Sequence, residues 1–241
     1  MKLLGIVLLI FLISYIFIKR RDLLTVKFEF KIDYLKYLIL YLILILVLIL
    51  FIDKKMAFFI SNKYPTGYFS LHPDLNIEYT KIFKIITHLG EPEYVALLVF
   101  PMFLYSKIKS IVKLENTSLG MIIVMILGVS ISTILKIIFM RSRPFLEWNS
   151  SGFYFIEDIL EREIPFKGTY MSFPSGHTMV AFCSYSFLAF KSQKTSIKIL
   201  CFLLAILVGV SRICLSAHWM SDVFTSAVIG TILGGVYANK R

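Results

Sequence analysis

Long apolar runs constrain this chain more than any other feature of its sequence. The clearest run extends from Tyr34 to Ile52 and is interrupted only by Lys36. A transmembrane helix needs about 20 predominantly apolar residues, so a run of this length indicates a helix that crosses a bilayer. Seven such runs can be recognised, at about residues 3–18, 35–52, 94–106, 119–140, 178–190, 199–216 and 219–237.

The composition leads to the same class of protein. Of the 241 residues, 58% are hydrophobic and 17% are charged, whereas roughly a quarter are charged in an average soluble domain. A soluble fold of this size cannot bury so much apolar surface in one core. The sequence therefore predicts an all-α polytopic membrane helical bundle, with a six-helix core in residues 35–241 and an additional hydrophobic segment in residues 1–34.

The first apolar segment, residues 3–18, has a second interpretation as a signal peptide. It contains only about 16 apolar residues, which is short for a membrane crossing. However, no small-residue cleavage site follows it, and Lys19, Arg20 and Arg21 are typical of the cytoplasmic end of a membrane helix. We expect the segment to be retained, with a basic cytoplasmic linker after it.

The net charge of +11 would suit a nucleic-acid partner, but the distribution of the charges argues against one. Basic residues gather in alternate connections between the apolar runs, at 19–36, 107–113 and 191–198, where they outnumber the acids. The connections at about 53–93 and 141–177 mix both signs. The positive-inside rule then places the basic connections in the cytoplasm and the mixed ones on the other side of the membrane.

Three short polar blocks stand beside these apolar runs, on the predicted outer side. In the first, Lys136 and Arg143 are seven residues apart, and two helical turns take about 7.2 residues. Both side chains are therefore expected on nearly the same helix face, with Pro144 ending the helix at Arg143. A charged Lys136 inside an apolar run is unfavourable unless it is paired or hydrated. The alternative is a lysine that only reaches toward the membrane surface.

The second block is Pro174-Ser175-Gly176-His177, directly before an apolar run. Ser175 is a preferred N-cap residue, and Gly176 allows the backbone to approach a ligand closely. The free amides of a helix N-terminus suit a phosphate oxygen. By itself, a capped helix start with an unrelated histidine explains this block equally well.

The third block contains Ser211 and Arg212, followed by His218 and Asp222. Residues four apart on a helix are neighbours, so the Asp222 carboxylate is expected beside the His218 imidazole. A carboxylate on one ring nitrogen fixes the tautomer and leaves the other nitrogen as a nucleophile. The three blocks together place three cations, two histidines and one carboxylate on one membrane face, which indicates chemistry on a phosphate. No carboxylate cluster accompanies them, so no divalent metal is implied.

This pattern resembles the three-part signature of the type 2 phosphatidic acid phosphatase superfamily, and every signature position matches. The resemblance implies a metal-independent membrane phosphatase that needs no cofactor. It further implies that His218 attacks phosphorus, that Asp222 orients it, and that His177 protonates the leaving oxygen and later activates water. The phosphate would be held by Lys136, Arg143, Arg212, Ser175 and Gly176.

A site at the outer membrane boundary suits a lipid phosphate substrate in the bilayer of a bacterial cytoplasmic (inner) membrane. The candidates are lipid A phosphate, undecaprenyl diphosphate, phosphatidylglycerol phosphate and phosphatidic acid, and no residue decides between them. We expect the loop 145–173 to roof the site, and we expect His72 and His88 to be ordinary loop residues. The alternative function is a lipid or small-molecule transporter or flippase, although the substrate sites of alternating-access transporters lie near the membrane midplane. The sequence does not indicate an oligomeric state.

Overall fold

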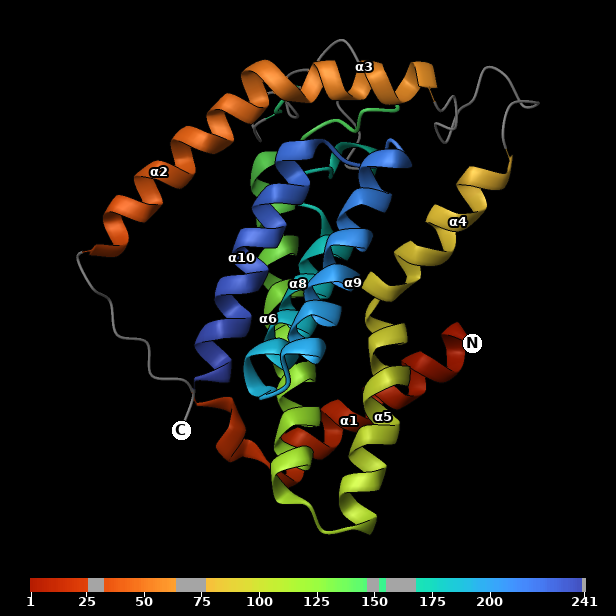
Figure 1. The fold of residues 1–241 in the computed structure, drawn as a ribbon, viewed down its shortest axis with the longest axis vertical. Coiled ribbons are helices and arrows are strands. Elements are labelled where there is room, and N and C mark those ends of the chain that lie inside the picture. Colours follow the sequence, from red (N-terminus) through yellow and green to blue (C-terminus); the bar gives the residue numbers. More distant parts are fainter. Residues whose placement is uncertain (26–32, 64–76, 147–151, 155–167, 240–241) are drawn as a thin grey trace.

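The computed structural model describes residues 1–25, 33–63, 77–146, 152–154 and 168–239, and in this part of the chain it contains helices and no strands. Figure 1 shows a bundle with its long axis vertical. The predicted all-α membrane bundle is confirmed. The helices are α1 (Lys2–Lys19), α2 (Asp33–Val47), α3 (Asp53–Lys63), α4 (Ile77–Thr87), α5 (Pro92–Ile108), α6 (Val112–Phe139), α8 (Gly176–Lys191), α9 (Thr195–Cys214) and α10 (Met220–Ala238).

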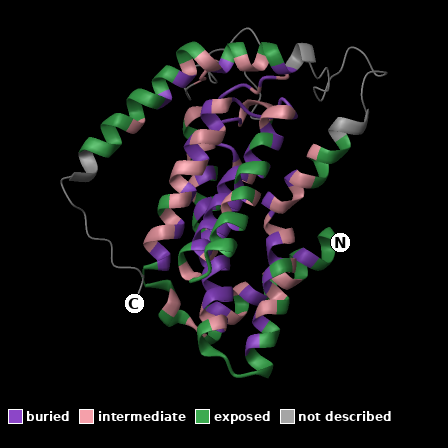
Figure 2. Cartoon of the chain, in the orientation of Figure 1, coloured by how far each residue is buried: buried purple, intermediate pink, exposed green. Residues whose placement is uncertain are grey.

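Five helical stretches in the described ranges are long and apolar enough to cross a membrane. They are Lys2–Lys19, Lys36–Ile60, Val112–Phe139, Thr195–Cys214 and Met220–Ala238. The other two predicted segments are also helical, but α5 and α8 have only 17 and 16 residues. Figure 2 shows that α2 is largely exposed, whereas buried residues concentrate in α6, α8 and α10. An exposed apolar helix is expected where lipid replaces water.

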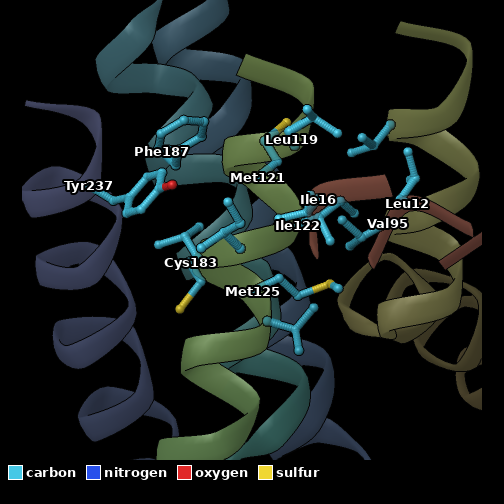
Figure 3. Close-up of a cluster of buried hydrophobic side chains, with 14 of the residues drawn as sticks. Leu12, Ile16, Val95, Leu119, Met121, Ile122, Met125, Cys183, Phe187 and Tyr237 are labelled. Carbon is cyan, nitrogen blue, oxygen red and sulfur yellow. The ribbon is translucent and has the colours of Figure 1, made fainter. Parts of the chain in front are cut away.

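The core forms around α8, which packs against α6, α9 and α10. Gly230 lets α10 approach closely, because a Cβ at this position would lie 2.7 Å from the Cβ of Phe182. Small residues at helix contacts serve the same purpose in many membrane bundles. Farther along the same interface, the ring centroids of Phe187 and Tyr237 are 5.7 Å apart, and Figure 3 shows the two side chains next to each other. The closely packed centre of the bundle therefore carries the starts of α8 and α10, next to two of the polar blocks.

Helix α1 packs along α5, and an ion pair holds each of its ends. Lys2 Nζ lies 2.9 Å from Glu91, and Arg20 Nη1 lies 3.2 Å from Glu115. Leu12 and Ile16 are buried in the core. The segment that could be read as a signal peptide is thus packed as part of the bundle. Its retention in the mature protein stays a prediction.

The connection at residues 53–93 was expected to be a loop, and this expectation was wrong. After α2, a π-helical turn, η2 (Leu48–Ile52), leads into α3, which lies across the end of the bundle in Figure 1. One side of helix α3 faces the bundle, with Asp53, Met56, Ala57 and Ile60, and the other side is exposed, with Lys54, Lys55, Phe58 and Phe59. The residues on its inner side are spaced as on a helix, but the mixed charges of this segment hid that pattern in the sequence.

Helix α4, the second helix in this connection, packs against α9 and continues into the short helix η3 (His88–Gly90). It therefore brings residues from the last part of the expected loop to the end of α9. This is the end of the bundle at which the three polar blocks meet.

Candidate active site

His218 lies on the short connection between α9 and α10, and only 3% of it is exposed. Its Nδ1 is 2.8 Å from the carbonyl oxygen of Ser172 and 3.6 Å from Oδ2 of Asp222. A carbonyl oxygen can only accept a hydrogen bond, so the hydrogen of the neutral ring is assigned to Nδ1. The lone pair is then on Nε2, which can act as a nucleophile.

Asp222 contacts His218 in a different way from the sequence prediction. Helix α10 begins at Met220, so the two residues are not one turn apart on a helix. The carboxylate of Asp222 accepts the N–H of Trp219 at 3.0 Å and the hydroxyl of Ser172 at 2.5 Å. Ser172 therefore links the carboxylate to the imidazole. Nothing in the spacing of Ser172 marked it as a site residue.

Arg141 is a second residue that the sequence analysis missed. Its guanidinium is fully buried, and Nη1 lies 2.6 Å from Oδ1 of Asp222. A buried charge needs a partner, and this pairing favours the ionised form of the Asp222 carboxylate. In the sequence, Arg141 could be recognised only as a second basic residue two positions before Arg143, which is a weak indication of a site residue.

Lys136 lies in the last turn of α6, where its ammonium group is held by the backbone. Its Nζ donates hydrogen bonds to the carbonyl oxygens of Met171 at 2.8 Å and Pro174 at 2.6 Å. A Cβ at Gly176 would lie 3.9 Å from Cε of Lys136. The lysine therefore reaches the start of α8 rather than the membrane surface.

Arg143 reaches the same region, but it is not on the helix that carries Lys136. Helix α6 ends at Phe139, because Met140 takes a left-handed conformation with φ of 33°. The predicted shared helix face, with the helix ending at Arg143, is therefore wrong. The Arg143 guanidinium instead donates to the carbonyl oxygens of Gly168 at 2.9 Å and Ala217 at 3.2 Å.

The second block forms the beginning of α8, as predicted. Ser175 is the N-cap residue and Gly176 is the first helical residue. The Ser175 hydroxyl lies 2.9 Å from the hydroxyl of Thr178 and makes no capping hydrogen bond. The Ser175 side chain therefore leaves the first amides of α8 uncapped, and such amides suit an anion.

His177, in the first turn of α8, faces an acidic residue from another helix. Its Nε2 is 3.6 Å from Oε1 of Glu91, the N-cap residue of α5. The same carboxylate oxygen is 2.8 Å from Nδ1 of His88. A Cβ at Gly90 would lie only 2.5 Å from the carbonyl oxygen of His177, so a glycine is required for this approach. His88, expected to be an ordinary loop residue, belongs to this cluster, whereas His72 lies outside the described residues.

Arg212, in the last turn of α9, is bonded to the unexpected helix α4. Its Nη1 lies 2.8 Å from the hydroxyl of Thr87, the last residue of α4. The positive charges of Arg143, Lys136 and Arg212 all act on His218. Burial and these charges outweigh the opposing effect of Asp222 and hold the pKa of His218 well below its usual value. All three predicted cations thus contribute to the positive potential at the His218 ring.

Only part of the expected roof, residues 145–173, belongs to the described ranges. Phe139, Phe153 and Phe173 form an aromatic cluster with ring centroids 5.2–6.2 Å apart. Trp148, Phe155 and Phe166 lie outside those ranges. In the part that is described, no group of three His, Cys, Asp or Glu side chains is arranged to hold a metal ion.

The arrangement as a whole contains the groups that binding and attacking an anion would require. Three cations and the first amides of α8 supply donors from four separate segments of the chain. One imidazole has a fixed tautomer, and a second lies at the start of α8 near a carboxylate. Donors held in place in this way stabilise the negative charge of a phosphoryl transition state without reorganisation.

Comparison with known proteins identifies the family of this chain. A family model described as "PAP2 superfamily" matches residues 117–240, more than half of the chain. Phosphatidylglycerophosphatase B of Bacillus subtilis (strain 168) is 35% identical over 71 residues, which are 26% of this chain and 35% of that protein. The chain thus matches about a third of the length of this curated relative.

Two solved structures have a similar fold. A transmembrane PAP2-type phosphatidylglycerolphosphate phosphatase from Bacillus subtilis superposes with a TM-score of 0.57 at 21% identity, over 83% of this chain and 92% of that chain. Aquifex aeolicus LpxE superposes with a TM-score of 0.50 at 25% identity, over 78% of this chain and 95% of that chain. The matched residues 117–240 contain all three polar blocks, and the chain belongs to the PAP2 superfamily.

Proposed function

We propose that this chain is an integral membrane phosphatase that hydrolyses a lipid phosphate or lipid diphosphate through a phosphohistidine intermediate. The proposal rests on the surroundings of His218. Its Nδ1 faces the Ser172 carbonyl and the Asp222 carboxylate, and three cations act on the ring from nearby. A neutral imidazole with a fixed tautomer beside such cations is suited to attack a bound phosphate.

In the first step, Nε2 of His218 attacks phosphorus and the bond from phosphorus to the leaving oxygen breaks. Lys136, Arg143, Arg212 and the first amides of α8 stabilise the negative charge on the other phosphoryl oxygens. His177 gives its proton to the leaving oxygen, which departs as the hydroxyl of the lipid or, from a diphosphate, as a lipid monophosphate. Asp222 stabilises the positive charge that develops on the His218 ring.

In the second step, water attacks phosphorus and the bond from phosphorus to Nε2 of His218 breaks. His177, now neutral, accepts a proton from that water. Inorganic phosphate is released, and both histidines return to their starting states. No cofactor or metal ion enters either step of the proposed reaction.

The site is proposed to face the extracytoplasmic side of a bacterial cytoplasmic membrane. The basic connections at 107–113 and 191–198 lie at the end of the bundle opposite the site, which supports this orientation by the positive-inside rule. The substrate candidates are phosphatidylglycerol phosphate, phosphatidic acid, undecaprenyl diphosphate and lipid A phosphate. The relative named phosphatidylglycerophosphatase B favours the first of these for the initial assay.

The test is phosphate release by the purified full chain in detergent, with EDTA present, from each of the four candidate lipids. We expect the wild type to release phosphate from at least one lipid and to carry a radiolabelled phosphohistidine in rapidly quenched samples. His218→Ala is expected to abolish both signals, and Lys198→Ala, an exposed residue at the opposite end of the bundle, is expected to retain them. Near-normal release by His218→Ala would exclude the covalent mechanism. Transbilayer lipid movement by the protein in proteoliposomes, without phosphate release, would favour the transporter alternative.

A further inference from the structure

Asp53 is a buried carboxylate that none of the three signature blocks contains. It is the first residue of α3, directly after the π-helical turn η2, and only 1% of it is exposed. An ionised side chain in such a position needs partners. Its partners come from the loop after α6 and from the start of α10, more than 80 residues away along the chain.

The two oxygens of Asp53 have different partners. Oδ2 lies 2.7 Å from Nη2 of Arg141 and 2.5 Å from the hydroxyl of Ser221. Oδ1 accepts the backbone N–H of Ser221 at 2.9 Å. Ser221 is the second residue of α10, so Asp53 satisfies one of the free amides at the start of this helix. A negative charge at a helix N-terminus is also favourable.

Arg141 connects Asp53 to the proposed catalytic carboxylate. While Nη2 contacts Asp53, Nη1 lies 2.6 Å from Oδ1 of Asp222. The rings of Phe153 and Trp219 lie near the guanidinium, with centroids 4.6 and 5.1 Å from its Cζ. Both ends of a planar guanidinium are thus occupied and its position is restricted, so the place of one carboxylate influences the place of the other.

These contacts differ from those of a residue that only anchors α3. An anchor could pair with any group on the bundle. Asp53 instead binds the guanidinium that holds Asp222 and the amide of the residue directly before Asp222. Two separate contacts therefore lead from Asp53 to the carboxylate next to His218.

We propose that Asp53 is a positioning residue that fixes Asp222, and through it His218, so that docking of α3 on the bundle is a condition for catalysis. The proposal rests on the phosphatase function proposed above. Asp53 touches no substrate in this mechanism. It holds the guanidinium and the first turn of α10 in the place that the nucleophile requires.

The test is a double-mutant cycle of Asp53→Asn and Asp222→Asn, measured as the rate of phosphohistidine formation and as kcat and KM. We expect Asp53→Asn to lower kcat about tenfold to a hundredfold with KM changed less than about twofold, as for other residues that orient a catalytic group. In the Asp222→Asn background the same change is expected to lower kcat by less than about threefold, because contacting residues in one network are not additive. Lys54→Gln, on the exposed side of α3, is the matched control and is expected to retain wild-type turnover.

Ser221→Ala provides a second route if Asp53→Asn does not fold. It removes the hydroxyl shared by Asp53 and Arg141 without changing a charge, and we expect it to lower kcat about threefold to tenfold, again only when Asp222 is present. Equal losses with and without Asp222, or wild-type activity of both variants, would overturn the inference. These results leave the proposed function standing, since that function is tested separately by phosphate release from the wild type and by its loss in His218→Ala.

Discussion

Thr87 and Arg212 are 125 residues apart in the chain, and a hydrogen bond of 2.8 Å joins the Thr87 hydroxyl to Nη1 of Arg212. Both residues are buried at the point where α4 meets the end of α9. The orientation of one of the three cations thus depends on a helix that lies outside the family match at residues 117–240. Residues that shape the site are therefore not confined to the signature.

Thr87→Val keeps the shape of the side chain and removes this hydrogen bond. We expect kcat/KM for the preferred lipid phosphate to fall about tenfold, because hydrogen bonds to charged groups contribute about 1.5–3 kcal/mol. Initial rates over a range of lipid concentrations check this. Thr133→Val is the control, since the Thr133 hydroxyl is exposed and bonds only its own helix backbone at Val129. Equal kinetics of the two variants would show that Thr87 does not orient Arg212.

Glu91→Gln tests the carboxylate that lies 3.6 Å from His177. If Glu91 supports proton donation by His177, we expect kcat/KM to fall about tenfold for an alkyl phosphate, whose leaving oxygen needs a proton. For an aryl phosphate with a more acidic leaving group, the decrease should be less than about twofold. Glu93→Gln, two residues away and less buried, should leave both rates unchanged. The same decrease for both substrates would assign Glu91 a structural role only.

Lys136→Met should reduce stability as well as activity. The variant leaves the carbonyl oxygens of Met171 and Pro174 without their donor, and an unsatisfied buried polar group costs about 1–3 kcal/mol. We also expect phosphate release to fall by about a hundredfold or more from loss of the cation. Thermal unfolding in detergent and phosphate release should be compared with Lys198→Met. An unchanged melting temperature would contradict the proposed role of Lys136 in holding residues 171–174.

The lowered pKa of His218 predicts that this ring stays neutral in mildly acidic solution. A histidine with its usual pKa takes up a proton as the pH falls through about 6.5. Burial and the nearby cations shift the pKa of His218 downward, so its protonation should begin only at lower pH. NMR titration of the protein labelled at its four histidines, with His218→Ala to assign the signal, measures this. Half-protonation of His218 at or above pH 6.5 would contradict the prediction.

The fold class and the grouping of the three blocks could be predicted from the sequence, because both depend on local patterns. The apolar runs have the length of a membrane crossing, and each block stands at the end of one run. The family resemblance rests on residues inside these blocks, such as Lys136 and His218, and the family match confirms it.

The contacts that hold the site together were not predictable in the same way. Ser172 and Arg141 contact Asp222 from loops whose path depends on tertiary packing, and no periodic pattern records that path. The left-handed turn at Met140 separates Lys136 from Arg143, although their spacing fits a helix. Mixed charges concealed α3 and α4, because their buried faces are short and interrupted by polar residues. Site residues could be inferred from chemistry, whereas the residues that orient them required coordinates.

The two carbonyl groups that bind Lys136 also limit how it can meet a ligand. An ammonium group has three N–H donors, and those bonded to Met171 and Pro174 use two of them. A single donor remains for an incoming oxygen, and its direction is set by the other two. Lys136 would therefore select one angle of approach for the substrate before any bond is broken.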